Sequence, residues 1–170
     1  MSMSPTFPEM MLLREHGKGS KPARQPEQPA KRTRRQNEVA LAGVPLFSGI
    51  SRRHLRTLAA ETDVQVFKPG QIIVEEGMPG ETLFVVLEGQ AKVTRKKRKV
   101  GQVVPGDFFG ELSAIDGGER SASVIAETPM SLLRLFRHTL VDMVKSEPDF
   151  SRKLLDGIVA RLRQISGAGL

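Results

Sequence analysis

Residues 63–94 read DVQVFKPGQIIVEEGMPGETLFVVLEGQAKVT, a pattern typical of short strands joined by tight corners. Short runs of β-branched and aromatic residues alternate here with Gly and Pro, which supply the positive φ and the fixed φ of tight corners. The pattern continues to Leu135, so we predict strands at 64–67, 71–74, 82–87, 90–94, 100–104, 122–126 and 131–135. Short strands at this spacing indicate a compact, jelly-roll-like β-roll over about residues 63–136.

Helical spacing flanks the predicted roll on both sides. Before it, Ser51 is a candidate N-cap for a segment in which Leu55, Leu58 and Ala59 recur on one helical face. After it, helical periodicity resumes over about residues 138–165 and ends in an amphipathic helix. We therefore expect a mainly β domain over residues 39–170, with an N-terminal helical segment and C-terminal helices.

Length and composition fit one domain preceded by a tail. The chain has 170 residues, and residues 1–38 combine Pro, Gln, Lys, Arg and Gly without sustained periodicity, so we predict a disordered basic tail there. The sequence has no cysteine, which argues against disulfides and thiol chemistry. The apolar run at 10–13 is too short for a signal sequence, and charges interrupt every candidate membrane span. We expect a cytoplasmic protein.

The net charge of +7 comes largely from two basic runs, Lys31–Arg35 and Arg95–Lys99. The second run falls between two predicted strands, so we expect it at an exposed hairpin tip. Either run is explained by solvation of a surface segment or by an anionic partner. Neither contains aromatic residues for base stacking, so nucleic-acid binding through them would depend steeply on salt.

Residues 105–124 contain the groups that we expect to bind a ligand. Gly110 lets the backbone approach a ligand, and a short helical turn predicted at Leu112–Asp116 would aim free N–H groups and a helix dipole at an anion. Arg120 offers a guanidinium fork for two phosphate oxygens, and Ser121 and the Ala122 amide add donors. This segment therefore predicts a phosphate site.

Glu111 stands at the mouth of the same turn, where a carboxylate would repel a phosphate. An ionised carboxylate accepts strongly from hydroxyl groups, so Glu111 on a ribose 2′-OH and Arg120 on a phosphate would select a compact ribonucleotide. A 3′,5′-cyclic phosphate has that shape.

Phe109-Gly-Glu-Leu-Ser-Ala-Ile115 and Glu119-Arg-Ser-Ala-Ser-Val124 closely resemble the phosphate-binding cassette of cyclic-nucleotide-binding domains, which occur in catabolite activator protein, protein kinase A regulatory subunits and cyclic-nucleotide-gated channels. The resemblance runs from about Val44 to the final helix. It implies that Arg120 binds the phosphate and Glu111 the ribose, with further contacts from Gly110, Leu112, Ser113, Ser121 and Ala122.

The resemblance also bears on the base. Family members cap the base with their last helix, which here offers Arg161, Leu162 or Arg163 to the purine. The family often places Thr after the arginine when it favours guanine, and Ser occurs there in bacterial cAMP binders. Ser121 therefore favours cAMP, with cGMP as the alternative.

We expect a stand-alone cAMP sensor in which ligand repositions the C-terminal helix for a downstream protein partner. We expect no cofactor, metal or enzymatic activity, because the three histidines lack metal-ligand spacing and no nucleophile is paired with a base. The chain stops at Leu170 with no helix-turn-helix after the lid, which argues against DNA binding by that motif. A nucleic-acid-associated regulator acting through its basic tail is the remaining alternative.

Overall fold

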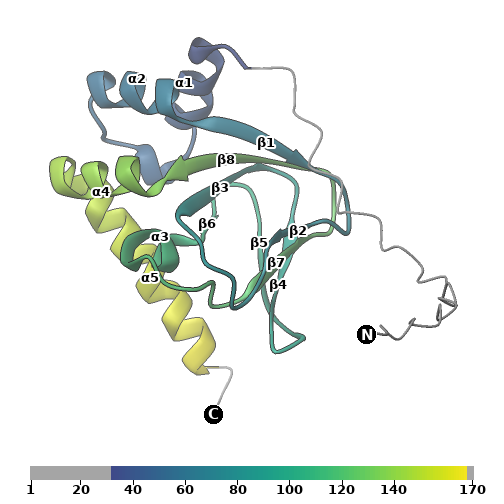
Figure 1. Cartoon of the computed structure of the whole chain (residues 1–170). Helices are drawn as coiled ribbons and strands as arrows, with labels where there is room; N and C mark the ends of the chain where they lie inside the picture. Colours follow the sequence, from purple (N-terminus) through teal and green to yellow (C-terminus); the bar gives the residue numbers. More distant parts are fainter. Residues whose placement is uncertain (1–31, 168–170) are drawn as a thin grey trace, which may run out of the picture.

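The computed structural model describes residues 32–167, which form two antiparallel four-stranded sheets flanked by helices (Figure 1). The elements in chain order are α1 (Arg34–Ala42), the 3₁₀ helix η1 (Pro45–Phe47), α2 (Arg52–Glu61), β1 (Asp63–Phe67), β2 (Ile72–Val74), β3 (Thr82–Glu88), β4 (Ala91–Arg95), β5 (Arg98–Val103), β6 (Phe108–Phe109), α3 (Glu111–Asp116), β7 (Ser123–Ala126), β8 (Met130–Phe136), α4 (Arg137–Ser146) and α5 (Pro148–Gly167). The predicted mainly β roll with flanking helices is confirmed.

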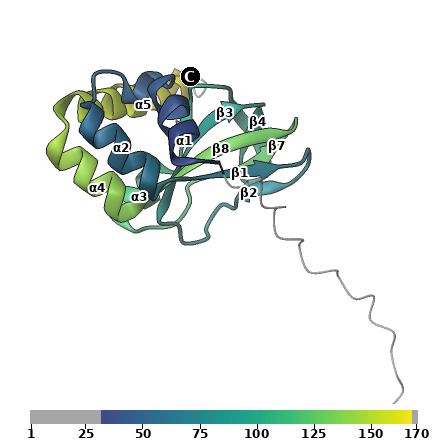
Figure 2. The same ribbon diagram turned by 90° about the horizontal axis from the view of Figure 1, so that it is seen from above.

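The two sheets face each other across the roll. One has the order β1-β8-β3-β6 and the other β2-β7-β4-β5, so strands distant in sequence lie side by side in both. Viewed from above, α2, α4 and α5 gather on one side of the molecule and the strands on the other (Figure 2). The molecule thus has a helical layer against one sheet and a second sheet that closes the roll.

Strands β3 and β8 separate two hydrophobic cores, because successive side chains of a strand point to opposite faces. Leu83 and Val85 of β3 pack with the helices in one cluster. Phe84 and Val86 pack inside the roll with side chains of the other sheet. The run Leu83–Val86 is buried throughout, which explains why its sequence is continuously apolar.

Within the helical layer, the segment around η1 packs against the start of α5. The rings of Phe47 in η1 and Phe150 in α5 stack with centroids 5.8 Å apart, and both side chains are fully buried. Gly49, which has a positive φ of 85°, lets the segment after η1 turn beside Asp149. The N-terminal helices are therefore anchored to the start of α5.

Helix α1 corrects part of the predicted tail. Residues 1–31 lie outside the described residues, so disorder there stays a prediction, whereas residues 34–38 belong to α1. Thr33 and Gln36 form a capping box at its start. Asn37 is buried and donates to the carbonyls of Ala59 (3.4 Å) and Thr62 (3.3 Å), which ties the helix to α2. These contacts offset the polar composition that suggested disorder.

Candidate functional site

The segment from β6 to β7 forms a cassette around α3. Gly110 precedes α3 with a φ of 81°, and Gly117 follows it with a φ of 75°. Residues other than glycine rarely adopt this left-handed conformation, so both corners depend on glycine. The predicted helical turn at Leu112–Asp116 is present, beginning one residue earlier at Glu111. The chain then returns through Arg120 to β7.

Arg120 lies buried in a cradle of oxygen atoms, with 7% of its surface exposed. Its Nη1 donates to the carbonyls of Thr82 (2.8 Å) and Gly110 (2.9 Å) and to Ser113 Oγ (2.7 Å). Its Nη2 donates to Thr82 Oγ1 (2.9 Å). Within residues 32–167, Nε itself forms no hydrogen bond. The guanidinium is thus held in one orientation with donor capacity left for a ligand.

Two glycines make room for this guanidinium. A Cβ at Gly80 would lie 2.1 Å from Arg120 Nε and 2.3 Å from Cζ, and a Cβ at Gly110 would lie 2.4 Å from Nη1. None of these three distances is possible between non-bonded atoms. A side chain at either position would therefore displace Arg120 from its cradle.

Glu111 supplies the opposite charge and is 2% exposed. Its Oε1 accepts from Arg161 Nη1 of α5 at 2.5 Å. Burial lowers the pKa of Arg120, and the nearby Glu111 carboxylate acts in the opposite direction. Arginine titrates so far above neutrality that the guanidinium stays charged. The cassette therefore holds a buried cation and a buried anion close together.

The remaining predicted contact residues fall into two groups. Ser113 is buried and belongs to the Arg120 cradle. Ser121 is exposed and Ala122 half-buried, so both lie at the surface of the cassette. Leu112 is 47% exposed on the outer face of α3, so any contact it makes with a ligand in the cassette would come from its backbone.

A family model for the cyclic nucleotide-binding domain matches residues 64–147, which include the whole cassette. The chain belongs to the cyclic nucleotide-binding domain family. The resemblance found in the sequence is thereby confirmed, and the buried Arg120 and Glu111 lie in the segment that carried it.

Two curated proteins and a crystal structure are similar to this cyclic nucleotide-binding domain. The chain is 30% identical over 129 residues to the Cyclic AMP receptor protein of Thermus thermophilus, covering 73% of this chain and 60% of that protein. It is 33% identical over 122 residues to the cAMP-dependent protein kinase regulatory subunit of Aspergillus fumigatus, covering 71% and 30%. A crystal structure of a cyclic nucleotide-binding domain from Methylobacillus flagellatus superposes with a TM-score of 0.64 at 26% identity, covering 79% of this chain and 81% of that one. The chain therefore spans less than two thirds of the length of both curated relatives.

Helix α5 crosses the cassette of this cyclic nucleotide-binding domain (Figure 1). Gly157 allows the close approach, since a Cβ there would lie 2.4 Å from the ring of Phe108. Arg161 donates to the Phe108 carbonyl as well as to Glu111, and its Cζ lies 5.4 Å from the Phe108 ring centroid. Leu162 and Arg163, the other predicted lid residues, are exposed. Of the three, Arg161 alone is bonded to a predicted ligand-binding residue.

Sequence reasoning missed Gly80, Thr82 and Phe84 as parts of the site. The sequence pattern indicates a corner at Gly80 and strand residues at Thr82 and Phe84, yet β3 forms one wall of the Arg120 cradle. The Arg120 Cζ also lies 5.9 Å from the Phe84 ring centroid. Thr82 is 38 residues from Arg120, so no local pattern joins them.

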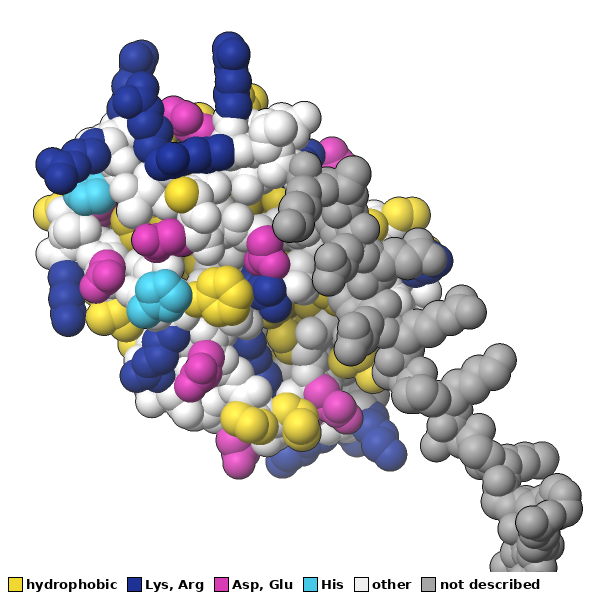
Figure 3. Space-filling view, turned by 45° about the horizontal axis from the view of Figure 1, so that its top comes forward, with side chains coloured by type: hydrophobic (Ala, Val, Ile, Leu, Met, Phe, Trp, Pro, Cys, Tyr) yellow, Lys and Arg dark blue, Asp and Glu magenta, His cyan; other side chains and the backbone are white. Residues whose placement is uncertain are grey.

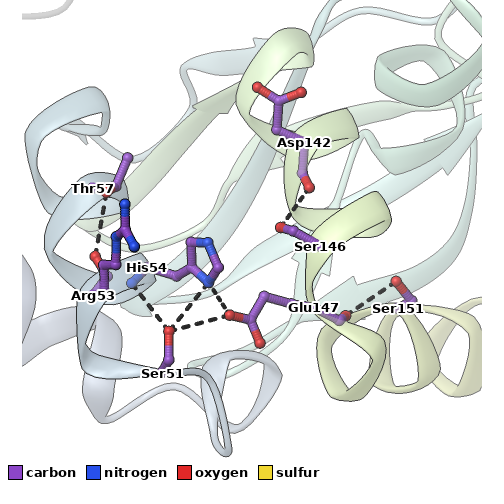
Figure 4. A network of polar contacts seen from close by, with 8 residues as sticks. All are labelled: Ser51, Arg53, His54, Thr57, Asp142, Ser146, Glu147 and Ser151. Carbon is purple, nitrogen blue, oxygen red and sulfur yellow. Dashed lines mark hydrogen bonds and ion pairs between the residues drawn. The ribbon is translucent and has the colours of Figure 1, made fainter.

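A second polar cluster contains a serine, a histidine and a glutamate, whose proximity the sequence did not predict (Figure 4). Ser51 Oγ lies 3.1 Å from His54 Nδ1, and Glu147 Oε1 bonds the same nitrogen. A catalytic triad instead uses the two imidazole nitrogens separately, one for the acid and one for the nucleophile. Ser51 Oγ also accepts from the His54 backbone N–H as the N-cap of α2. The cluster is therefore a structural connection between α2 and the start of α5.

A surface hollow of about 770 Å³ lies away from the cassette, between α1, η1 and the end of β3. Neither Arg120 nor Glu111 lines it. Within residues 32–167, no group of three His, Asp or Glu side chains is arranged to hold a metal ion, and no helix is long and apolar enough to cross a membrane.

Proposed function

We propose that this chain binds a cyclic purine nucleotide, with Arg120 on the phosphate and Glu111 on the ribose 2′-OH. The observation that carries the proposal is the presence of a buried cation and a buried anion in one cassette. Buried charges are costly unless they are paired or bind a ligand of complementary charge. Gly110, Leu112, Ser113 and Ala122 contribute backbone contacts, and Ser121 contacts the phosphate.

The 3′,5′-cyclic phosphate is favoured because its anion and its free ribose hydroxyl belong to one small, rigid unit. The Nε–H of Arg120 and the second Nη2 hydrogen form the fork that pairs two phosphate oxygens. The four bonds that hold the guanidinium fix the direction of this fork before ligand arrives. Such preorganisation lowers the entropy lost on binding.

Helix α5 transmits the signal in this proposal. The ribose hydroxyl and the Arg161 guanidinium both bind the Glu111 carboxylate, so ligand changes the contact that holds α5 against the cassette. Leu162 and Arg163 are exposed in this structure, and when α5 moves one of them would cap the purine. A partner protein then recognises the new position of α5. The shift requires that the nucleotide bind more tightly to one α5 position than to the other.

We favour cAMP over cGMP as the ligand, because position 121 is Ser, as in bacterial cAMP binders, and not the threonine typical of guanine-preferring members. The proposal assigns no enzymatic step to the chain, since the cassette has no base aimed at a nucleophile. It places the protein in the cytoplasm, in keeping with a sequence that lacks cysteine.

Calorimetry on nucleotide-free protein tests the proposal, with cAMP and cGMP titrated separately. Arg120→Lys keeps the charge but removes the fork, and we expect it to weaken cAMP binding about 100-fold through the loss of charge-assisted bonds. Arg134→Lys is the matched control, because Arg134 forms a similar fork with Asp63 (2.9 and 2.6 Å) on β1. The proposal fails if neither nucleotide binds or if Arg120→Lys binds like the control.

A further inference from the structure

The β4–β5 hairpin concentrates positive charge at a projecting tip. Strand β4 ends at Arg95 and β5 begins at Arg98, so Lys96 and Lys97 form a two-residue turn. In Figure 1 this hairpin extends beyond the rest of the roll. All five residues from Arg95 to Lys99 are exposed. On the face shown in Figure 3, by contrast, basic side chains are interspersed with acidic ones.

The local conformation of this tip is unfavourable for the residues that form it. Lys96 and Lys97 have φ values of 48° and 64°, a left-handed conformation that tight hairpins normally assign to Asn and Gly. Arg95 and Arg98 are directly opposed in the antiparallel register, and like charges placed this way repel each other. The hairpin therefore keeps a dense array of cations at a cost to its own stability.

Most of this charge has no acidic partner among residues 32–167. Lys99 Nζ lies 3.4 Å from Glu127 Oε1, but within residues 32–167 the side chains of Arg95, Lys96, Lys97 and Arg98 form no ion pair. Glu76 Oε2 accepts from the backbone N–H of Lys96 at 2.8 Å, which fixes the turn without involving the Lys96 ammonium in a hydrogen bond. The turn is thus anchored by its backbone while its cations point into solvent.

We propose that the β4–β5 hairpin binds the phosphate backbone of duplex nucleic acid. A two-stranded β-ribbon fits the major groove of B-DNA, and a line of cations on both strands matches phosphates on either side of it. An anionic membrane is a poorer match, because residues 94–99 offer no apolar side chain for insertion into the bilayer. The tip residues are not among the predicted nucleotide contacts, although β4 pairs with β7 at the end of the cassette. Binding by the hairpin needs no helix-turn-helix.

Fluorescence anisotropy with a labelled duplex of about 20 base pairs, roughly two helical turns, tests this proposal on the full chain. Lys96→Asn/Lys97→Gly installs the residues that the turn prefers and removes two charges, so it keeps or raises the melting temperature. Two lost phosphate contacts reduce the slope of log K against log salt by about 1.8 and weaken binding about 60-fold at 0.1 M salt. Arg52→Gln/Arg53→Gln, on the exposed start of α2, removes the same charge elsewhere and leaves the slope unchanged.

Three results overturn the proposal: equal weakening by the hairpin and α2 variants, an unchanged salt slope in the hairpin variant, or no duplex binding by wild-type protein at about 50 mM salt. The proposal is also overturned if the wild type binds phosphatidylserine vesicles more tightly than duplex at equal salt, which would favour a lipid. Tighter binding to poly-glutamate than to duplex would overturn it in favour of an acidic protein. Because the hairpin variant leaves Arg120 and Glu111 intact, calorimetry with cAMP distinguishes failure here from failure of the nucleotide site.

Discussion

Gly80→Ala separates the function of Arg120 from the stability of the fold. The added methyl group would lie 2.1 Å from Arg120 Nε, whereas ordinary van der Waals contact begins at 3.4 Å, so the guanidinium must move by about 1.3 Å. That shift breaks the hydrogen bonds of 2.7–2.9 Å that orient it. Gly80 does not have a positive φ, so alanine itself causes no backbone strain.

The expected loss is large for the ligand and small for the protein. A phosphate held by two charge-assisted bonds loses about 3–6 kcal/mol when the fork is misplaced, and every 1.4 kcal/mol is about tenfold in affinity. We therefore expect cAMP binding to fall at least about 100-fold. Because the displaced group is the end of a flexible side chain, the melting temperature should change by only a few degrees.

Calorimetry with cAMP and thermal melting of the same samples measure both effects. Gly101→Ala on β5 is the control, because a Cβ there meets nothing within 4 Å and its φ is not positive. If Gly80→Ala binds cAMP within about threefold of the control, well under 1 kcal/mol, the Arg120 cradle is not the phosphate site.

Three further substitutions probe the ribose, the base and the lid. Glu111→Gln should reduce the preference for cAMP over its 2′-deoxy analogue by about tenfold, because a neutral acceptor bonds a hydroxyl more weakly. Competition binding measures the ratio of the two affinities. If this ratio is unchanged, Glu111 does not bind the ribose. Ser121→Thr should shift the ratio of cGMP to cAMP affinity upward by severalfold in the same assay, and no shift would separate this position from base choice. Gly157→Ala should push α5 away from Phe108 and break the Arg161–Glu111 bond, which tryptic cleavage after Arg161 would report as faster digestion than in wild type.

The sequence predicted the parts of the molecule that depend on local patterns. Strand alternation and Gly–Pro corners are properties of neighbouring residues, so the roll and the glycines that bound α3 could be predicted. Helix α1 was missed because its stability comes from Asn37, which bonds residues 22 and 25 positions away. Its capping box, Thr33-x-x-Gln36, was nevertheless visible in the sequence. The two-residue strand β6 is too short to have a period.

In the candidate site, too, the residues of one local segment could be predicted and their distant partners could not. Arg120 and Glu111 follow from charge and motif within one segment, whereas their partners Thr82 and Arg161 lie 38 and 50 residues away. Only the strand order and the fold of α5 against the roll bring these groups together. The preformed cradle and the bond between Glu111 and α5 therefore could not be predicted from the cassette sequence alone.

The two hydrophobic cores that share β3 and β8 determine how the molecule opens in solution. Each core can loosen while the other stays packed. The helical layer and the β2-β7-β4-β5 sheet can therefore unfold locally as separate cooperative units. Amide protons of β3 and β8 exchange only when both units open, because each strand contributes side chains to both cores. Slow exchange should thus be concentrated in these two strands, and the backbone of Thr82, at the start of β3, belongs to the most persistent part of the fold.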